Sequence, residues 1–342
     1  ETNSVVLIES TANQVDQNGG YTGMKPIDFH DWVYALAEQV GLDRDRVYLG
    51  GDHLGPLTVT DLPEKEAMAY ARVLLHDYVL AGYTKIHIDT SMKVADDDPN
   101  ERLQDAMIAR RGAELARVCE DAYQELLQTR PDAIRPVYIV GSEVPIPGGA
   151  QDPDAGMQVT RVEDFKATYA TFKQAFAKEG LEEIWKDVMA IVVQPGVEEK
   201  DAGCEEYERE RASALMASIK GFDHIVFEGH STDYQTKYKL REMVEDGIGI
   251  LKVGPGMTLA MREALFSLAY MEEVQLHGIH EAEKSHLMDV LEEAMLKEPK
   301  YWKKYYHGSE DEIWFKRRFS FSDRCRYYWP EPKVDAAKHK MI

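Results

Sequence analysis

Short apolar runs alternate along the chain with longer amphipathic stretches. The apolar runs are rich in β-branched residues, as buried strands are, and they cover residues 5–8, 47–49, 86–88, 137–140, 190–193, 225–227 and 248–253. Between them the apolar positions follow a helical period, which predicts helices over about 27–40, 64–81, 101–128, 162–187, 205–220, 233–245 and 258–275. The pattern therefore predicts seven strands that alternate with helices.

This alternation favours an α/β fold with a parallel sheet. A closed (β/α)8 TIM barrel needs eight strands, and the chain begins without Met and almost directly on a strand. We therefore expect a TIM barrel whose first strand is missing from the residues given. A doubly wound open sheet is the alternative, but no G-x-G-x-x-G motif follows the first strand.

Residues 276–342 have a different character. They are helical at first and then aromatic and basic, as in residues 301–306 and 324–329. We expect a barrel over residues 1–275 and a helical, aromatic C-terminal extension over 276–342 that packs on the barrel or on a partner.

Charge and cysteine content narrow the possible functions. The chain of 342 residues has 40 Lys and Arg against 61 Asp and Glu, a net charge of −21, which argues against binding to nucleic acid. No apolar run reaches the roughly 20 residues of a membrane span, and no secretory signal opens the chain. Cys119, Cys204 and Cys325 form no C-x-x-C motif, so we expect reduced thiols and a cytoplasmic location.

Nearly every predicted strand ends in polar residues. In strand order they are Glu9 and Ser10, Asp52 and His53, His87 and Asp89, Glu143, Gln194, Glu228 and His230, and Lys252. Strand ends converge in a barrel, and so many buried polar groups are costly unless they bind something. Imidazole, carboxylate and amide groups together indicate a divalent metal site. For one strand end alone, an N-cap Asp beside a packed His is the alternative, and His87, deeper in its strand, is expected to be structural.

Glycine-rich turns suggest a place for phosphate. Gly254 and Gly256 lie where the last strand gives way to a helix, and backbone N–H groups there could hold a phosphate, although on this stretch alone a tight turn explains the glycines better. Residues 19–25 lack the G-x-x-x-x-G-K-[ST] spacing of a nucleotide loop, which disfavours an ATP-dependent kinase.

Several long motifs carry a family resemblance. They are LIESTANQ at 7–14, GGYTGM at 19–24, GGDHLGP at 50–56, EGHSTDYQT at 228–236, and the stretches 85–91, 141–149, 192–197, 250–255, 301–306 and 322–330. With them the chain resembles the non-catalytic (accessory) subunit family of class II D-tagatose-1,6-bisphosphate aldolases, which includes ketose and ketose-phosphate 4-epimerases. That family normally carries a first barrel strand upstream, and some members have been labelled tagatose 6-phosphate kinases.

The resemblance also implies roles for particular residues. It makes Asp52 the acid/base at the hexose O4, His53 and His230 metal ligands, and Glu143 a catalytic carboxylate near the metal. Gln194 stands where an aldolase would place another His. An amide oxygen is a weaker ligand than imidazole, so the cofactor is expected to be Zn²⁺, Mn²⁺, Co²⁺ or Mg²⁺.

Asp89 joins the candidate catalytic residues. The candidate substrate- or phosphate-binding residues are Glu9, Ser10, Gln14, Ser231, Lys252, Gly254 and Gly256. The sequence thus leads to a metal-dependent 4-epimerase of a ketohexose or ketohexose 6-phosphate that works by retro-aldol and aldol steps. The alternative is a non-catalytic subunit that stabilises a class II aldolase catalytic partner. Assembly into a homo-oligomer is a further hypothesis.

Overall fold

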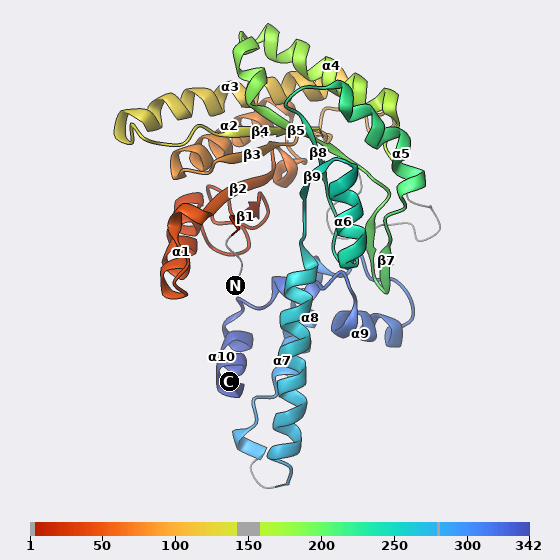
Figure 1. Ribbon diagram of the computed structural model, residues 1–342. Helices are drawn as coiled ribbons and strands as arrows, with labels where there is room; N and C mark the ends of the chain where they lie inside the picture. Colours follow the sequence, from red (N-terminus) through yellow and green to blue (C-terminus); the bar gives the residue numbers. More distant parts are fainter. Residues whose placement is uncertain (1–3, 142–157, 279–280) are drawn as a thin grey trace.

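Seven parallel strands form one curled sheet in the computed structural model, which describes residues 4–141, 158–278 and 281–342 (Figure 1). The sheet order is β1-β2-β3-β4-β5-β8-β9. The strands are β1 (Val6–Thr11), β2 (Val47–Leu54), β3 (Lys85–Ile88), β4 (Val137–Val140), β5 (Val188–Val193), β8 (Val226–Gly229) and β9 (Ile248–Leu251). The predicted parallel α/β architecture and all seven strands are confirmed.

The sheet does not close into an eight-stranded barrel within the described residues. β1 and β9 stand at its two ends, and neither has a strand paired to its outer edge there. The expected closed TIM barrel is therefore seen as a curled seven-stranded sheet that is open between these two strands.

Helices connect consecutive strands and cover the outer face of the sheet (Figure 1). They are α1 (Pro26–Gln39), α2 (Glu64–Ala81), α3 (Asp105–Thr129), α4 (Val162–Lys178), α5 (Arg209–Ser218) and α6 (Lys237–Asp246). Helix α7 (Pro255–Gln275) follows the last strand and extends away from the sheet (Figure 1). Among these described helices, none is long and apolar enough to cross a membrane.

Four of the expected helices are shorter than the sequence predicts, and two of these, α3 and α6, begin four residues later than expected, at Asp105 and Lys237. The helix expected over 162–187 stops at Lys178, because Gly180 has a φ of +66° that ends the helical path, and a 3-10 turn covers Glu182–Asp187. The helix expected from 205 begins at Arg209, because β6 (Glu198–Lys200) and β7 (Gly203–Glu205) form an antiparallel hairpin before it.

The C-terminal part has a hydrophobic core of its own. It contains α8 (Leu287–Lys297), α9 (Glu310–Phe319) and α10 (Pro332–Met341), which lie around α7 below the sheet in the view of Figure 1. Leu265 and Phe266 of α7 belong to this second core, with Trp302, Tyr306 and Trp329. Helix α7 thus joins the sheet to the C-terminal helices, and the second core begins before residue 276.

Candidate functional site

An irregular stretch of β2 brings two neighbouring side chains into one site. Between Gly51 and Leu54 the strand holds one residue more than β3 does, which is a β-bulge, and His53 adopts a left-handed φ of +49°. A regular strand would send consecutive side chains to opposite faces. Here Asp52 and His53 are both buried, and their side chains approach to 3.7 Å.

Strand β3 lines the site with every second residue. Lys85, His87 and Asp89 alternate with Ile86 and Ile88, and all five are buried. Because side chains alternate along a strand, the three polar residues share one face.

A glycine lets the end of β3 come close to the loop after β2. A Cβ atom at Gly55 would lie only 1.8 Å from the carbonyl oxygen of Asp89, so no other residue fits there. This close approach helps to place the Asp89 carboxylate against His53.

Two histidines are oriented by groups that fix which nitrogen carries the proton. Nδ1 of His53 lies 2.7 Å from Oδ2 of Asp89, and Nε2 of His87 lies 3.0 Å from the carbonyl oxygen of Gly141. A carbonyl can only accept, so Nε2 of His87 donates, and its unprotonated Nδ1 accepts the backbone N–H of His53 at 3.2 Å. That Nδ1 lies 3.0 Å from the Asp52 carboxylate. Outer nitrogens held in this way are a hallmark of metal-ligating histidines.

His230 completes a group of three imidazoles. Its ring centroid lies 5.1 Å from that of His53 and 5.4 Å from that of His87. Its Nε2 is 2.9 Å from Oε1 of Glu228, two residues earlier on the same face. Burial lowers the pKa of His230 to about 4, and Lys252 acts in the same direction, so its ring is neutral at pH 7 as a metal ligand must be.

Two buried lysines hold the carboxylates of the site together. Lys85 Nζ lies 2.7 Å from Glu9 and 2.7 Å from Glu228. Lys252 Nζ lies 2.6 Å from Asp52, 3.8 Å from Glu228 and also contacts Glu9. Lys252 follows β9, whereas Glu9 is on β1, so these contacts connect the two ends of the open sheet.

The local charges decide which groups are ionised. Burial alone would raise the pKa of Asp52, but His53 and Lys252 outweigh it and hold that pKa well below its usual range. Burial likewise opposes ionisation of Glu228, and Lys85 and Lys252 bring its pKa down. Burial would lower the pKa of Lys252, but Asp52 and Glu9 raise it. Both carboxylates are therefore ionised at neutral pH.

The donor set fits a divalent cation. One group of potential ligands comprises Asp52, His87, Glu228 and His230, and an overlapping group comprises His53, His87 and Asp89, with the ligand atoms in each group within 4.8 Å of one another. The site holds four carboxylates, of Glu9, Asp52, Asp89 and Glu228, against two ammonium groups. The excess of carboxylates over ammonium groups and the mixed nitrogen and oxygen donors suit Zn²⁺, Mn²⁺ or Co²⁺.

Some of the predicted site residues are engaged elsewhere. The Oγ of Ser10 is fully buried against the hydroxyls of Tyr78 and Tyr83, at 3.0 and 3.3 Å. Gln14 accepts a hydrogen bond from the backbone of Thr11 at 2.9 Å. These contacts give both residues a local structural role.

One predicted metal ligand lies outside the groups described above, and another falls on a residue that the structure does not describe. The amide oxygen of Gln194 accepts the backbone N–H groups of Gly196 and Val197, at 2.7 and 3.0 Å, which uses both of its lone pairs. Glu143 lies outside the described residues.

The expected phosphate loop is already occupied. The N–H groups of Gly254 and Gly256 donate to the carboxylate of Asp233, at 3.0 and 2.7 Å. In this arrangement a phosphate would have to displace that carboxylate. Ser231, with a φ of +54°, lies in the same loop after β8 as Asp233, and its hydroxyl is 3.4 Å from Glu198.

The C-terminal part places a cation, Arg326, near the loop that contains Asp233. Burial raises the pKa values of Asp233 and Glu199, and that of Tyr21 in the loop after β1, and the nearby Arg326 guanidinium opposes the rise in each. The rings of Tyr21 and Tyr327 meet edge to face at 5.0 Å. The C-terminal extension thus packs on the sheet at the side of the candidate site.

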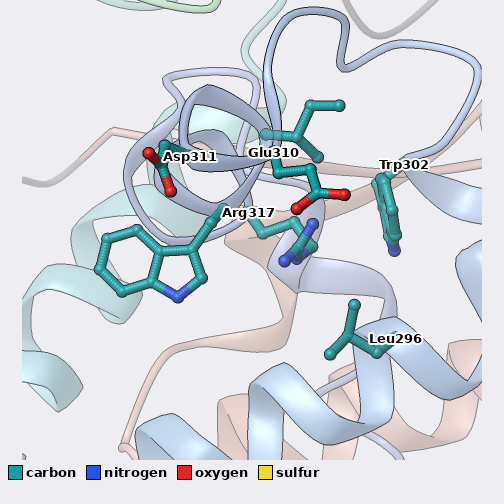
Figure 2. Close-up of a pocket in the computed structure, with 7 residues that line it drawn as sticks. Leu296, Trp302, Glu310, Asp311 and Arg317 are labelled. Atoms are coloured by element: carbon teal, nitrogen blue, oxygen red, sulfur yellow. The ribbon is translucent and has the colours of Figure 1, made fainter.

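A separate concavity lies away from these residues, between α8 and α9 (Figure 2). It has a volume of about 650 Å³ and is lined by Leu296, Trp302, Glu310, Asp311, Ile313, Trp314 and Arg317. The Arg317 guanidinium is paired with Glu292 and lies over the ring of Trp302. None of the strand-end residues lines this cavity, so we place the chemistry at the sheet.

Sequence reasoning missed Lys85 and underrated His87. Lys85 is the first residue of its strand, whereas the predicted site residues are those at the ends of strands. The alternation of Lys85, His87 and Asp89 with two isoleucines was nevertheless visible, and it marks a polar face inside a buried strand. The structure places His87 in both groups of potential ligands, where a structural role had been expected.

Comparison with known proteins agrees with the resemblance seen in the sequence. The family described as "D-tagatose-1,6-bisphosphate aldolase subunit GatZ/KbaZ-like" matches residues 1–342. The D-tagatose-1,6-bisphosphate aldolase subunit GatZ of Salmonella paratyphi B is 45% identical over 341 residues, which are 100% of this chain and 78% of the relative. The subunit of the same name from Salmonella agona is 45% identical over 98% of this chain and 77% of its own length.

A solved structure is similar over almost the whole chain. It is the crystal structure of a probable tagatose 6 phosphate kinase from Sinorhizobium meliloti 1021. It has a TM-score of 0.87 and 43% identity, and the match covers 99% of this chain and 80% of that one.

Proposed function

This chain belongs to the GatZ/KbaZ-like family of D-tagatose-1,6-bisphosphate aldolase subunits, and we propose that it holds a divalent metal and acts on a ketohexose phosphate in its own pocket. The observation that carries this proposal is the orientation of His53 and His87, whose outer nitrogens are fixed by Asp89 and Gly141 while their inner nitrogens face Asp52. A site that had lost its chemistry would have no need of such costly buried charges.

The proposed reaction is inversion at C4, which interconverts the 6-phosphates of fructose and tagatose. A bound divalent cation would polarise the ketose carbonyl as a Lewis acid. Asp52 accepts the proton of the O4 hydroxyl as the C3–C4 bond opens. It returns this proton to the same oxygen when the bond forms again on the other face of the aldehyde, so atoms and charge balance without a redox cofactor.

The residues around Asp52 serve this proton transfer. Lys252, 2.6 Å away, keeps the carboxylate ionised and thus ready to accept a proton. Lys85 pairs with Glu9 and Glu228 and so keeps two further carboxylates in place. Burial excludes water, which would otherwise compete for the aldehyde.

The test is an assay of the purified chain with fructose 6-phosphate in the presence of Mn²⁺, Zn²⁺, Co²⁺ or Mg²⁺. We expect tagatose 6-phosphate to form with at least one metal and to disappear with EDTA. Trace release of dihydroxyacetone and glyceraldehyde 3-phosphate would support the cleavage route. Absence of any C4 epimer with all four metals would refute the epimerase.

The second candidate function is that of an accessory subunit for a class II aldolase. The names of the Salmonella relatives support it more directly than they support an epimerase, because both relatives are called aldolase subunits. It predicts that the isolated chain is inert towards ketose phosphates. It also predicts that adding the chain raises the activity or lifetime of an aldolase catalytic subunit on tagatose 1,6-bisphosphate, and that Asp52→Asn preserves this effect.

A further inference from the structure

The proposed reaction makes no use of the concavity between α8 and α9 (Figure 2). Its volume of about 650 Å³ lies in the range of pockets that hold a ligand. Two large apolar side chains in its wall remain in contact with solvent, because Leu296 is 53% exposed and Trp314 is 46% exposed. Exposed apolar groups that gather around a hollow, with polar residues at its rim, are typical of interaction sites.

The floor of this concavity is held in place by the second core. Trp302 is buried there, and its Nε1 donates a hydrogen bond to the carbonyl oxygen of Met295 at 2.6 Å. The Cζ of Arg317 lies 4.8 Å from the centroid of the Trp302 ring, and the Nε of Arg317 donates to Glu292 at 3.0 Å. A surface that is already ordered loses little conformational entropy when it binds a partner. Tryptophan and arginine are also among the residues that most often dominate binding energy.

The rim of the concavity carries negative charge. Glu310 and Asp311 lie in the first turn of α9 and line the cavity (Figure 2), and within the described residues no basic side chain forms an ion pair with either of them. The guanidinium groups of Arg317 and Arg318 share the carboxylate of Glu292, at contacts that include 2.9 Å from Arg318. Three carboxylates therefore lie near two guanidinium groups, which leaves an excess of negative charge at the rim.

We propose that this concavity docks a segment of another protein, one that presents a large apolar side chain next to a lysine or arginine. The apolar side chain packs against Leu296, Trp302 and Trp314. The cation reaches the carboxylates of Glu310 and Asp311. An apolar centre within a polar rim is the usual anatomy of a protein interface.

Charge decides between the possible occupants of the concavity. An anionic ligand would meet the carboxylates of the rim. A second copy of this chain, with its net charge of −21, would also bring like charge to them. A basic segment of a different protein gains from the same field. The inference is independent of the proposed epimerase, because none of the strand-end residues lines this cavity.

Selection from random peptides displayed on phage, with the 342-residue chain as the immobilised target, tests the proposal. We expect the enriched peptides to combine Trp, Phe, Leu or Met with an adjacent Lys or Arg. The most enriched peptide is then synthesised, and its affinity for the chain in solution is measured by calorimetry. Because the charged contact at the rim is exposed to solvent, this affinity should fall as salt is added.

A tryptophan variant locates the apolar contact. Trp314→Ala should weaken binding of the synthetic peptide at least about tenfold, as the loss of a central aromatic residue in an interface commonly does. Trp32→Ala on α1 is the matched control, because Trp32 is similarly exposed at 50% and lies outside the concavity. It should leave the affinity unchanged. Circular dichroism verifies that both variants are folded.

A pair of charge variants tests the rim. The double variant Glu310→Gln/Asp311→Asn keeps the shape of both side chains and removes their charge, so it should weaken binding and abolish most of its salt dependence. Glu182→Gln/Glu183→Gln is the control, because it removes two neighbouring exposed carboxylates elsewhere on the chain. The control should bind the peptide as the wild type does.

Four results would overturn the proposal. They are that no peptide is enriched, that the enriched peptides are acidic, that their binding is indifferent to Trp314→Ala, or that the rim variant leaves the affinity and its salt dependence unchanged. A dimer of the chain alone that Trp314→Ala dissociates, measured by light scattering after gel filtration, would overturn it as well, because the concavity would then join two copies of this chain.

Discussion

The Asp52→Asn variant distinguishes a pocket that catalyses the proposed reaction from one that does not. The amide keeps the shape of the carboxylate but removes the charge that lies 2.6 Å from Lys252 Nζ and 3.0 Å from His87 Nδ1. General-base catalysis is worth about 10²–10⁴-fold in rate. At 1.36 kcal/mol per factor of ten, the barrier should rise by roughly 3–5 kcal/mol. We therefore expect kcat for fructose 6-phosphate to fall at least about 100-fold.

The same change should leave the fold intact. Losing hydrogen bonds to charged partners costs about 1.5–3 kcal/mol, less than the 5–15 kcal/mol by which domains are usually stable. Lys252 also retains contacts with Glu9 and Glu228. Urea unfolding and circular dichroism should therefore show a folded variant with a modestly lower midpoint.

The assay measures kcat and KM separately at saturating metal, with bound metal quantified in both proteins. A loss confined to kcat identifies Asp52 as a group that acts in the transition state, whereas a change in KM alone indicates a role in binding. Asp61→Asn is the matched control, because Asp61 is exposed just beyond the same strand. If Asp52→Asn keeps more than a tenth of the wild-type kcat, the proposed proton transfer is wrong.

Further predictions concern charge, metal and phosphate. Lys252→Met removes the cation beside Asp52, so the pKa of Asp52 should rise and the acidic limb of the pH–rate profile should move to higher pH. His230→Ala should lower the metal content of the folded protein, measured by mass spectrometry of the bound metal, and equal content would exclude it as a ligand. Burial raises the pKa of Glu199 to about 7, so the folded state binds an extra proton above pH 4.5 and wild-type stability should fall between pH 5 and 8 by up to about 3 kcal/mol. Glu199→Gln should reduce that dependence in urea titrations, and Glu198, whose pKa burial raises to about 8, should maintain the remainder. Arg326→Met should raise KM at least about tenfold for a phosphorylated ketose and leave KM for the free sugar unchanged.

The strands could be located from the sequence because each is a short apolar run between amphipathic stretches. The hairpin of β6 and β7 was not predicted, because its strands are not apolar runs. Its strands carry Glu198, Glu199 and Lys200, and charged residues of this kind are depleted in strands. Glu198 and Glu199 are nevertheless buried, because the loop of Ser231 and the C-terminal extension pack over them. Burial by segments so distant in sequence leaves no local signal.

Within the site, the sequence predicts which side chains share a face of a regular strand, but it does not predict where the backbone is irregular. The side chains of Glu228 and His230 share a face for the same reason as those of Lys85 and His87. That rule would have sent Asp52 and His53 to opposite faces. Their convergence depends on the bulge and on the left-handed His53, a conformation that the surrounding packing must impose because the residue itself disfavours it.

The glycine-rich turn after β9 shows how a correct local argument can fail through a distant residue. N–H groups at the start of a helix attract anions, and Gly254 and Gly256 do bind one. The anion is the carboxylate of Asp233, which precedes Gly254 by 21 residues and already satisfies both donors. A substrate phosphate therefore gains little from these N–H groups unless Asp233 moves. The positive charge of Arg326, brought to this loop by the C-terminal extension, is the group on which selectivity for a phosphorylated sugar should depend.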